Sequence, residues 1–189
     1  MQTHKLLPNI LVTGTPGTGK TTFSALLADQ LTKAIQLKTN NPNLKFAHIE
    51  LSRAISEYKL YKKWDDKLNC SIFDDDMVND FLEPIMMNGG IIVDFHGSDF
   101  FPERFFDFVF IFRTNNTVLF DRLTERGYNQ KKIELNVECE ILEVCKEEAI
   151  ESYKPEIIFE FENNYEQDMN ANIEKCFVIF KERNTFAHL

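Results

Sequence analysis

Residues 9–22 read NILVTGTPGTGKTT, and this stretch decides the fold. A short apolar run ends in the pattern Gly-x-x-x-x-Gly-Lys-Thr, and apolar residues at helical spacing follow it. A triphosphate needs many hydrogen-bond donors at close range, and Gly14, Gly17 and Gly19 let backbone N–H groups close around it. Lys20 can reach the β- and γ-phosphates, and the Thr21 hydroxyl can bind Mg²⁺. The stretch therefore predicts a strand, a loop and a helix that bind a nucleoside triphosphate.

Size and composition bound the remaining possibilities. The 189 residues suit one domain with a real core, and 43% of them are hydrophobic, including 18 phenylalanines. The net charge is −9, from 30 acidic and 21 basic residues, so broad attraction to nucleic acid or to an anionic membrane is disfavoured. Any contact with RNA would have to be local or carried by a basic partner.

The four cysteines lack the spacing of a metal site. No Cys-x-x-Cys pair occurs, so we expect buried reduced thiols and no structural zinc. Residues 1–7 are too short and too polar for a signal peptide, and no apolar run approaches about 18 residues. We therefore expect an intracellular, reducing compartment and no membrane association.

Apolar runs alternate with helical patterns along the chain, which is typical of βαβ units and a parallel sheet. A periodic apolar pattern over 132–153 predicts one long amphipathic helix, and 36–44 is expected to be a plain surface loop. The predicted strands are 9–13, 45–51, 90–95, 106–113 and 156–161, and the predicted helices are 19–33, 52–61, 75–88, 116–126, 132–153 and 166–183.

An acid ends the buried strand within residues 90–97. The carboxyl edge of an open parallel sheet is where ligands bind, so we expect Asp94 to hold Mg²⁺ through water beside Thr21. The alternative is a carboxylate that caps a turn. His96 lies two residues further on and should leave the strand on the same side. It can orient an attacking water, bind the phosphate of a second substrate, or only hydrogen-bond the turn.

Two arginines share one face of the helix predicted at 116–126. Arg122 and Arg126 are four residues apart, and Gly127 follows where a mobile segment can begin. Guanidinium groups that close over the site can neutralise the charge of a migrating phosphoryl group. The alternative is a solvated face on which they pair with Asp121 or Glu125. Pattern favours the catalytic interpretation for Arg126 and leaves Arg122 open.

Four segments resemble the adenylate kinase isoenzyme six family, nuclear proteins of the adenylate kinase superfamily that are also described as coilin-interacting nuclear ATPases. They are 7–17, 93–104, 123–132 and 139–149, and the second contains Asp-Phe-His-Gly and Phe-Phe-Pro-Glu-Arg. The resemblance implies an α/β fold of three layers in one P-loop kinase domain over 1–189. It also implies a five-stranded parallel sheet, an acceptor-binding region near 45–73 and a short lid near 125–135.

The same resemblance implies a function. The γ-phosphoryl group of ATP would pass to AMP with Mg²⁺ as cofactor, and ATP hydrolysis would be a second activity. Such proteins act in maturation of the small ribosomal subunit by binding a basic ribosomal protein of the uS11 type, in nucleus and cytoplasm. The implied catalytic residues are Lys20, Asp94, His96 and Arg126. The implied ATP-binding residues are Gly14, Gly17, Thr18, Gly19, Lys20, Thr21, Thr22 and Arg126. The implied acceptor-binding residues are Arg53, His96, Gly97 and Arg122, and those at the metal are Thr21 and Asp94.

Two departures from the common adenylate kinases bear on the acceptor. Those enzymes follow the strand acid with Gly-Phe-Pro-Arg, whose arginine grips AMP, whereas residues 95–98 here are Phe-His-Gly-Ser. We therefore do not expect strong capture of AMP. Extra sequence at 39–43 precedes Arg53 and either displaces the acceptor region or forms an inert surface insertion, which we favour.

Three functions remain open at this point. The first is an ATP–AMP phosphotransferase that acts as a monomer. The second is a nucleotide-gated assembly factor, in which the acidic residues of 74–76 and 134–151 imitate RNA for a basic ribosomal protein. The third is a related kinase with another monophosphate acceptor.

Overall fold

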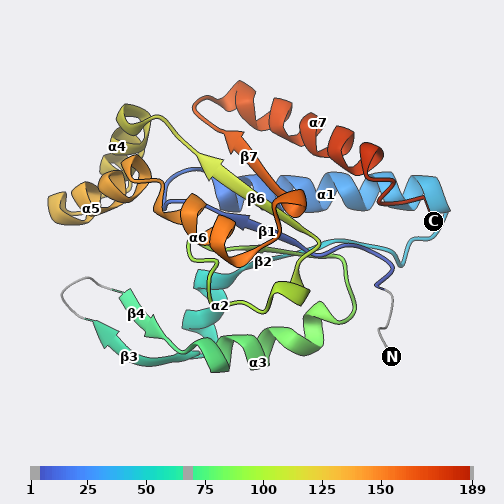
Figure 1. The fold of residues 1–189 in the computed structure, drawn as a ribbon, viewed down its shortest axis with the longest axis horizontal. Helices are drawn as coiled ribbons and strands as arrows, with labels where there is room; N and C mark the ends of the chain where they lie inside the picture. Colours follow the sequence, from blue (N-terminus) through green and yellow to red (C-terminus); the bar gives the residue numbers. More distant parts are fainter. Residues whose placement is uncertain (1–4, 66–69, 188–189) are drawn as a thin grey trace.

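A computed structural model describes residues 5–65 and 70–187, with backbone alone at 63–65 and 70–72. Five parallel strands form the central sheet in the order β2-β5-β1-β6-β7, which confirms the predicted fold class (Figure 1). Asp94 pairs with Val12 in one neighbouring strand and with Glu50 in the other. The strands are β1 Ile10–Thr13, β2 Ala47–Glu50, β5 Ile91–Asp94, β6 Phe108–Arg113 and β7 Ile158–Glu162.

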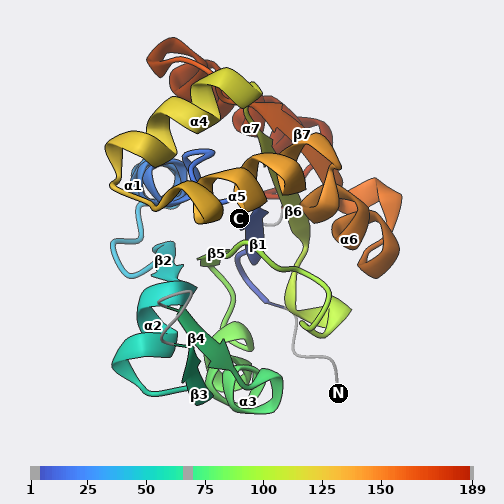
Figure 2. The same ribbon diagram turned by 90° about the vertical axis from the view of Figure 1, so that its left-hand side faces the viewer.

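Helices cover both faces of the sheet and complete the three layers (Figures 1 and 2). Helices α1 and α7 pack on one face, and α2, α3 and α6 pack on the other. Both faces are buried, which explains why the strands are continuous apolar runs. The helices are α1 Lys20–Thr39, α2 Leu51–Glu57, α3 Asp75–Met86, α4 Asn116–Glu125, α5 Gln130–Ile141, α6 Val144–Ser152 and α7 Glu166–Glu182, with short 3₁₀ turns at Glu103–Phe105 and Pro155–Ile157.

Phenylalanine side chains fill the layer between the sheet and α1. Phe23 of α1 is fully buried, and its ring centroid lies 4.5 Å from that of Phe112 and 6.1 Å from that of Phe161. Each such ring removes about 150–250 Å² of surface from water, so this cluster contributes strongly to the stability of the domain. The cluster holds α1, and with it the loop before α1, against the sheet.

The helix predicted over 132–153 is wrong, because the structure has two helices there. Helix α5 ends at Ile141 and α6 begins at Val144. Glu143 adopts a left-handed conformation between them, with φ of 55°. Its carboxylate and that of Glu140 both contact the Arg113 guanidinium, at 2.6 and 2.7 Å. These ion pairs join the helices to the sheet and override the helical periodicity.

Two further differences concern the region between α1 and α3. The plain loop predicted at 36–44 is wrong in its first part, since α1 continues to Thr39 and ends where Asn40 turns left-handed. The Gln36 side chain donates to the carbonyls of Pro42 and Leu44, each at 3.0 Å, and so holds the extra sequence against the helix. An antiparallel hairpin, β3 Tyr61–Asp65 and β4 Cys70–Phe73, was not predicted. Strand β3 is rich in charge and β4 has only four residues, so neither shows a clear pattern.

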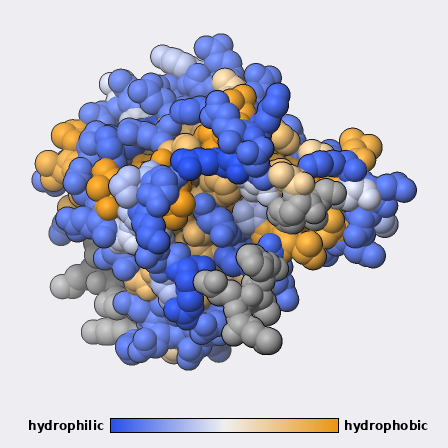
Figure 3. Space-filling view, turned by 45° about the vertical axis from the view of Figure 1, so that its right-hand side comes forward, coloured by the Kyte–Doolittle hydropathy of each residue, from blue (hydrophilic) through white to orange (hydrophobic). Residues whose placement is uncertain are grey.

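The cysteines agree with the prediction in part. Cys176 is buried, Cys139 and Cys145 are only partly buried, and all three are free thiols. The side chain of Cys70 lies outside the described residues. Across the described part of the chain, no helix has both the length and the apolar character to cross a bilayer. The face shown in Figure 3 is mostly hydrophilic, with scattered apolar groups.

Candidate active site

The predicted phosphate-binding loop lies at the carboxyl edge of the sheet, between β1 and α1. Gly14, Gly17 and Gly19 have φ of 139°, 102° and 96°, a region that other residues rarely adopt. Gly19 caps α1 without a side-chain hydrogen bond, and the first turn of α1 contains no acidic residue. The first N–H groups of the helix therefore lack a side-chain acceptor, and the positive end of its dipole faces the loop. This arrangement suits the phosphates of a nucleotide.

Lys20 supplies a buried positive charge at the loop. Its side chain is 8% exposed, and Nζ donates to the carbonyls of Gly14 at 2.6 Å and Thr15 at 3.0 Å. Among the described residues, no carboxylate forms an ion pair with this ammonium. Burial lowers the pKa of Lys20 to about 8, and the charge of Arg126 adds to this effect, whereas Asp94 and Glu140 act in the opposite direction. An anionic ligand in contact with the ammonium would stabilise its charge further.

The structure brings Thr21 and Asp94 together. The Thr21 hydroxyl donates to Asp94 Oδ2 at 2.5 Å, and the carboxylate is only 4% exposed. Asp94 therefore does not cap a turn, which was the alternative interpretation. Hydroxyl and carboxylate oxygens are the ligands that Mg²⁺ prefers, so the donor set fits this ion.

His48 is a site residue that sequence reasoning missed. Its Nε2 lies 2.8 Å from the other carboxylate oxygen of Asp94, and the side chain is 15% exposed. The residue reaches Asp94 from β2, the strand that pairs with β5. A polar residue inside a predicted apolar strand was the available signal. The contact orients the carboxylate toward Thr21.

His96 follows Asp94 and lies at the edge of the site. Its backbone carbonyl accepts a hydrogen bond from Thr13 Oγ1 at 3.2 Å, so the turn contact does not use the ring. His96 is exposed, and its imidazole packs on the Phe95 ring with 4.3 Å between the ring centroids. Desolvation, followed by the charges of Lys20 and Lys132, lowers the pKa of His96 to about 4. The ring is therefore neutral at neutral pH.

Arg126 and Arg122 have different surroundings. Arg126 ends α4 and is exposed, and its guanidinium has no hydrogen-bond or ion-pair partner within the described residues. Arg122 is held by the chain itself, since it donates to the carbonyls of Asn163 at 3.0 Å and Asn164 at 2.9 Å. It bridges α4 to the segment after β7 and is not free to bind an acceptor as predicted. The alternative of a solvated face is therefore wrong for Arg122 and stays open for the exposed Arg126.

The other predicted residues are spread around the loop. Thr18 is buried and its hydroxyl donates to the Thr15 carbonyl at 2.9 Å, whereas Thr22 is exposed in the first turn of α1. Arg53 is 76% exposed on α2, and its ion pair, at 3.8 Å, is with Glu57. The structure does not bring Arg53 into contact with the other predicted site residues. The fold does not require glycine at position 97, because the nearest atom to a Cβ there would be 3.8 Å away.

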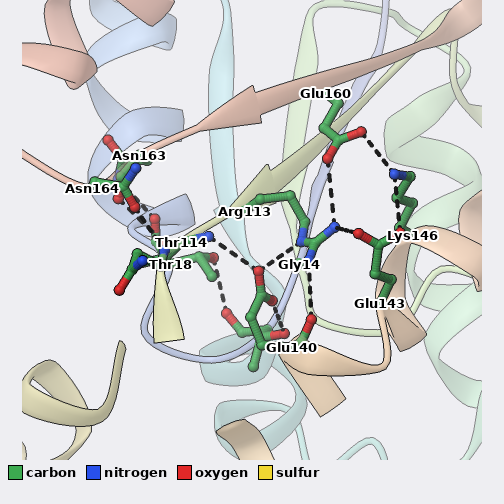
Figure 4. A network of polar contacts seen from close by, with 12 residues as sticks. Gly14, Thr18, Arg113, Thr114, Glu140, Glu143, Lys146, Glu160, Asn163 and Asn164 are labelled. Atoms are coloured by element: carbon green, nitrogen blue, oxygen red, sulfur yellow. Dashed lines mark hydrogen bonds and ion pairs between the residues drawn. The ribbon is translucent and has the colours of Figure 1, made fainter. Parts of the chain in front are cut away.

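Buried polar residues that were not predicted support the loop from behind. Asn163 donates to the Thr18 carbonyl at 2.7 Å. Glu140 accepts from the Thr15 hydroxyl at 2.5 Å and binds Arg113 at 2.7 Å (Figure 4). The contacts of Glu140 and Asn163 with the loop join residues at least 125 positions apart, so no sequence pattern predicts them.

A groove of about 1010 Å³ lies at the opposite edge of the sheet, and none of the predicted site residues lines it. Its charged groups largely neutralise one another. Lys5 pairs with Asp107 at 3.1 Å, and Arg104 pairs with Glu83 at 2.6 Å. Volume alone would select this groove as the candidate site, but the residues suited to binding a nucleotide lie at the loop.

Comparison with known proteins agrees with this geometry. The family model described as an AAA domain matches residues 10–143. The adenylate kinase isoenzyme 6 homolog of Dictyostelium discoideum is 43% identical over 165 residues, which cover 87% of each chain. The homolog of Candida albicans is 40% identical over 172 residues, which cover 91% of this chain and 68% of that protein.

Solved structures support the fold alone. A shikimate kinase from Bacteroides thetaiotaomicron superposes with a TM-score of 0.59 at 15% identity, and the match covers 92% of this chain and 98% of that one. At this identity the likeness carries no statement about substrate.

Proposed function

Because this chain belongs to the adenylate kinase isoenzyme 6 family and is a P-loop nucleotide kinase, we propose that it transfers the γ-phosphoryl group of ATP to AMP. ATP hydrolysis is the proposed second activity. One observation carries the proposal: the buried Lys20 ammonium, which forms no ion pair among the described residues, lies at the loop beside the paired Thr21 and Asp94. Phosphoryl transfer needs little covalent chemistry from a protein, so positioned charges suffice.

The donor nucleotide is the better supported of the two substrates. The loop amides and the first turn of α1 would hold its phosphates, and Lys20 would reach between the β- and γ-phosphates. Thr21 Oγ1 and Asp94 Oδ2 would hold Mg²⁺, which supplies charge neutralisation at the transferred group. His48 would keep the Asp94 carboxylate in place from its other oxygen. Arg126, unpaired among the described residues, can move over the phosphates and exclude water.

The acceptor must be bound without a dedicated arginine next to the strand acid. His96 is neutral, so it would offer a hydrogen bond to the acceptor phosphate and not an ion pair. Lys132, whose charge acts on His96, is a cation that could bind this phosphate. Arg53, in contrast, would have to leave Glu57 and approach from α2. Weak hold on the acceptor leaves room for water to take its place, which is the physical reason to propose hydrolysis as the second activity.

An assay of ADP formation from ATP tests the proposal. The rate is measured with each nucleoside monophosphate in turn and with none. We expect AMP to raise ADP formation the most, to two ADP per AMP consumed, and a slow rate to remain without any acceptor. If ADP formation shows no dependence on AMP, the phosphotransferase assignment is wrong. A dependence on another monophosphate instead would identify a different acceptor.

A second candidate is an assembly factor whose useful output is the nucleotide-controlled release of a partner. Exposed carboxylates at the start of α3 and along α5 and α6 favour it, among them Asp75, Asp76, Glu138 and Glu147. The proposed partner is a basic ribosomal protein of the uS11 type, bound by a monomer of this chain in nucleus and cytoplasm. A pull-down at physiological salt, with ATP, with ADP and without nucleotide, tests the idea. Retention that does not respond to nucleotide would eliminate it.

A further inference from the structure

A buried carboxylate joins the phosphate-binding loop to α5, the helix whose first part lies in the predicted lid near 125–135. Glu140 lies in the last turn of α5 and is only 2% exposed. One of its oxygens accepts the Thr15 hydroxyl at 2.5 Å, and the other accepts Arg113 Nε at 2.7 Å and the Thr114 N–H at 3.1 Å (Figure 4). Both oxygens are thus occupied, as a buried carboxylate requires.

The position of Glu140 is itself held by the sheet. Arg113 is the last residue of β6, and its guanidinium also donates to the Glu140 carbonyl at 3.0 Å and to the Glu143 carboxylate at 2.6 Å. Lys146 then bridges Glu143 and Glu160 at 3.1 Å each. Glu140 cannot shift without breaking a largely buried ion pair, so it is a rigid support.

Thr15 is the point at which this support meets the loop. Its side chain is fully buried, and its carbonyl accepts from Lys20 Nζ at 3.0 Å and from the Thr18 hydroxyl at 2.9 Å. The residue therefore links Glu140 to two of the loop's polar side chains. A change in the position of Thr15 would move the Lys20 ammonium and the loop amides together.

We propose that Glu140 is a positioning residue of the nucleotide site. It holds the Thr15 hydroxyl, and through Thr15 it keeps Lys20 in the geometry that binds phosphates. It also anchors the carboxyl end of α5 to the same loop, and the first part of α5 lies in the predicted lid near 125–135. The inference rests on the proposed nucleotide binding and adds a residue that touches no substrate. A loop that is already in place loses less freedom on binding, so the support raises affinity.

Titration calorimetry of the full chain with ADP tests this role. Thr15→Val removes the hydroxyl, keeps the shape of the side chain and leaves the Arg113 partners intact. We expect it to weaken ADP binding about tenfold, because a hydrogen bond to a charged group is lost. Thr15→Ser keeps the hydroxyl and should stay within about twofold of the wild type.

Two carboxylate variants separate positioning from general stability. Glu140→Gln removes the charge of the acceptor, so it should weaken ADP binding about as much as Thr15→Val, and the double variant should bind no more weakly than the worse single one, since both changes act on the same Thr15–Glu140 contact. Glu143→Gln is the matched control, because it disturbs the same arginine but does not touch the loop. It should leave ADP affinity within about twofold. Urea unfolding of each variant shows that the chains compared are folded.

Steady-state kinetics add a measurement, the separate KM values for ATP and AMP, that a general loss of stability would not change selectively. The KM for ATP should rise in Thr15→Val while the KM for AMP stays unchanged, since the loop binds only the donor. Wild-type ADP affinity in Thr15→Val would overturn the inference, and so would an equal loss in Glu143→Gln. A wild-type chain that binds no ADP would instead refute the proposed function.

Discussion

The Lys20→Met variant should be more stable than the wild type in the absence of nucleotide, and it should lose nucleotide binding. Methionine has a similar length, so the change removes the charge and keeps most of the packing. The two effects have opposite signs because the ammonium is buried without a carboxylate partner among the described residues. The fold thus keeps, for its function, a charge that weakens it.

The size of the effect follows from the pKa. Burial lowers the pKa of Lys20 from 10.5 to about 8, so the folded chain holds this proton less tightly than the unfolded chain. At about 1.4 kcal/mol for each pH unit, the charge lowers stability by about 3 kcal/mol below pH 8. This deficit shrinks as the pH rises from 8 and vanishes above 10.5. Methionine gives up the bonds to the Gly14 and Thr15 carbonyls, at about 1 kcal/mol each, so the net gain is about 1 kcal/mol.

Urea unfolding at pH 7.5 measures this gain, with and without Mg²⁺ and ADP. Without nucleotide the variant should unfold at higher urea, and a melting curve should shift upward by about 2–4 °C. With ADP at about 100 times its dissociation constant, the wild type should gain about 2.7 kcal/mol and the variant almost nothing. Adding ADP should therefore raise the stability of the wild type relative to that of the variant.

Lys33→Met is the matched control on the same helix. Lys33 is 69% exposed and pairs with Asp29 at 2.6 Å, so its loss should change stability by less than about 0.5 kcal/mol and leave the response to ADP intact. The reasoning would be refuted if Lys20→Met were less stable than the wild type without nucleotide. A stability difference that does not shrink between pH 8 and pH 10 would refute it as well.

Three further changes test other parts of the site. Gly14→Ala should lower the free energy of unfolding in urea by more than about 3 kcal/mol, because its Cβ would lie 2.3 Å from the Phe112 carbonyl oxygen. The control Gly127→Ala, with φ of 72° and no atom within 4 Å, should lower it by only about 1 kcal/mol. Equal losses in the two variants would contradict this. Arg126→Met should lower kcat about 1,000-fold with unchanged stability, and a small change would remove its role at the transferred phosphate. With a pKa of about 4, His96 is neutral above pH 5, so the ratio of wild-type to His96→Asn kcat/KM should stay constant from pH 6 to 8; a step near pH 6.5 would show that the ring titrates.

Part of the site could be predicted because its signals are local. The loop from Gly14 to Thr21 carries its own glycines, lysine and hydroxyl, and the apolar run before Asp94 identifies a buried strand. That both lie at one sheet edge follows from parallel strands, whose carboxyl ends meet there. The 2.5 Å contact of Thr21 with Asp94 is therefore a consequence that pattern and topology together predict.

The residues that support the site could not be predicted in this way. The spacing of Arg122 places it correctly on a helix face, but its acceptors lie 41 and 42 residues away in the chain. His48 reaches Asp94 across 46 residues, and Glu140 reaches Thr15 across 125. No local period encodes such pairs.

The sequence by itself thus determined the five strands of the central sheet, most of the helices between them, the phosphate-binding loop and the acid beside it. Hydrophobic periodicity and backbone freedom act over a few residues, so they can be read directly from the chain. Only the tertiary structure decided that α5 and α6 separate at Glu143, that His48 orients Asp94 and that Glu140 supports Thr15. Those features depend on which charged and polar groups meet once they are buried, where each must find a partner.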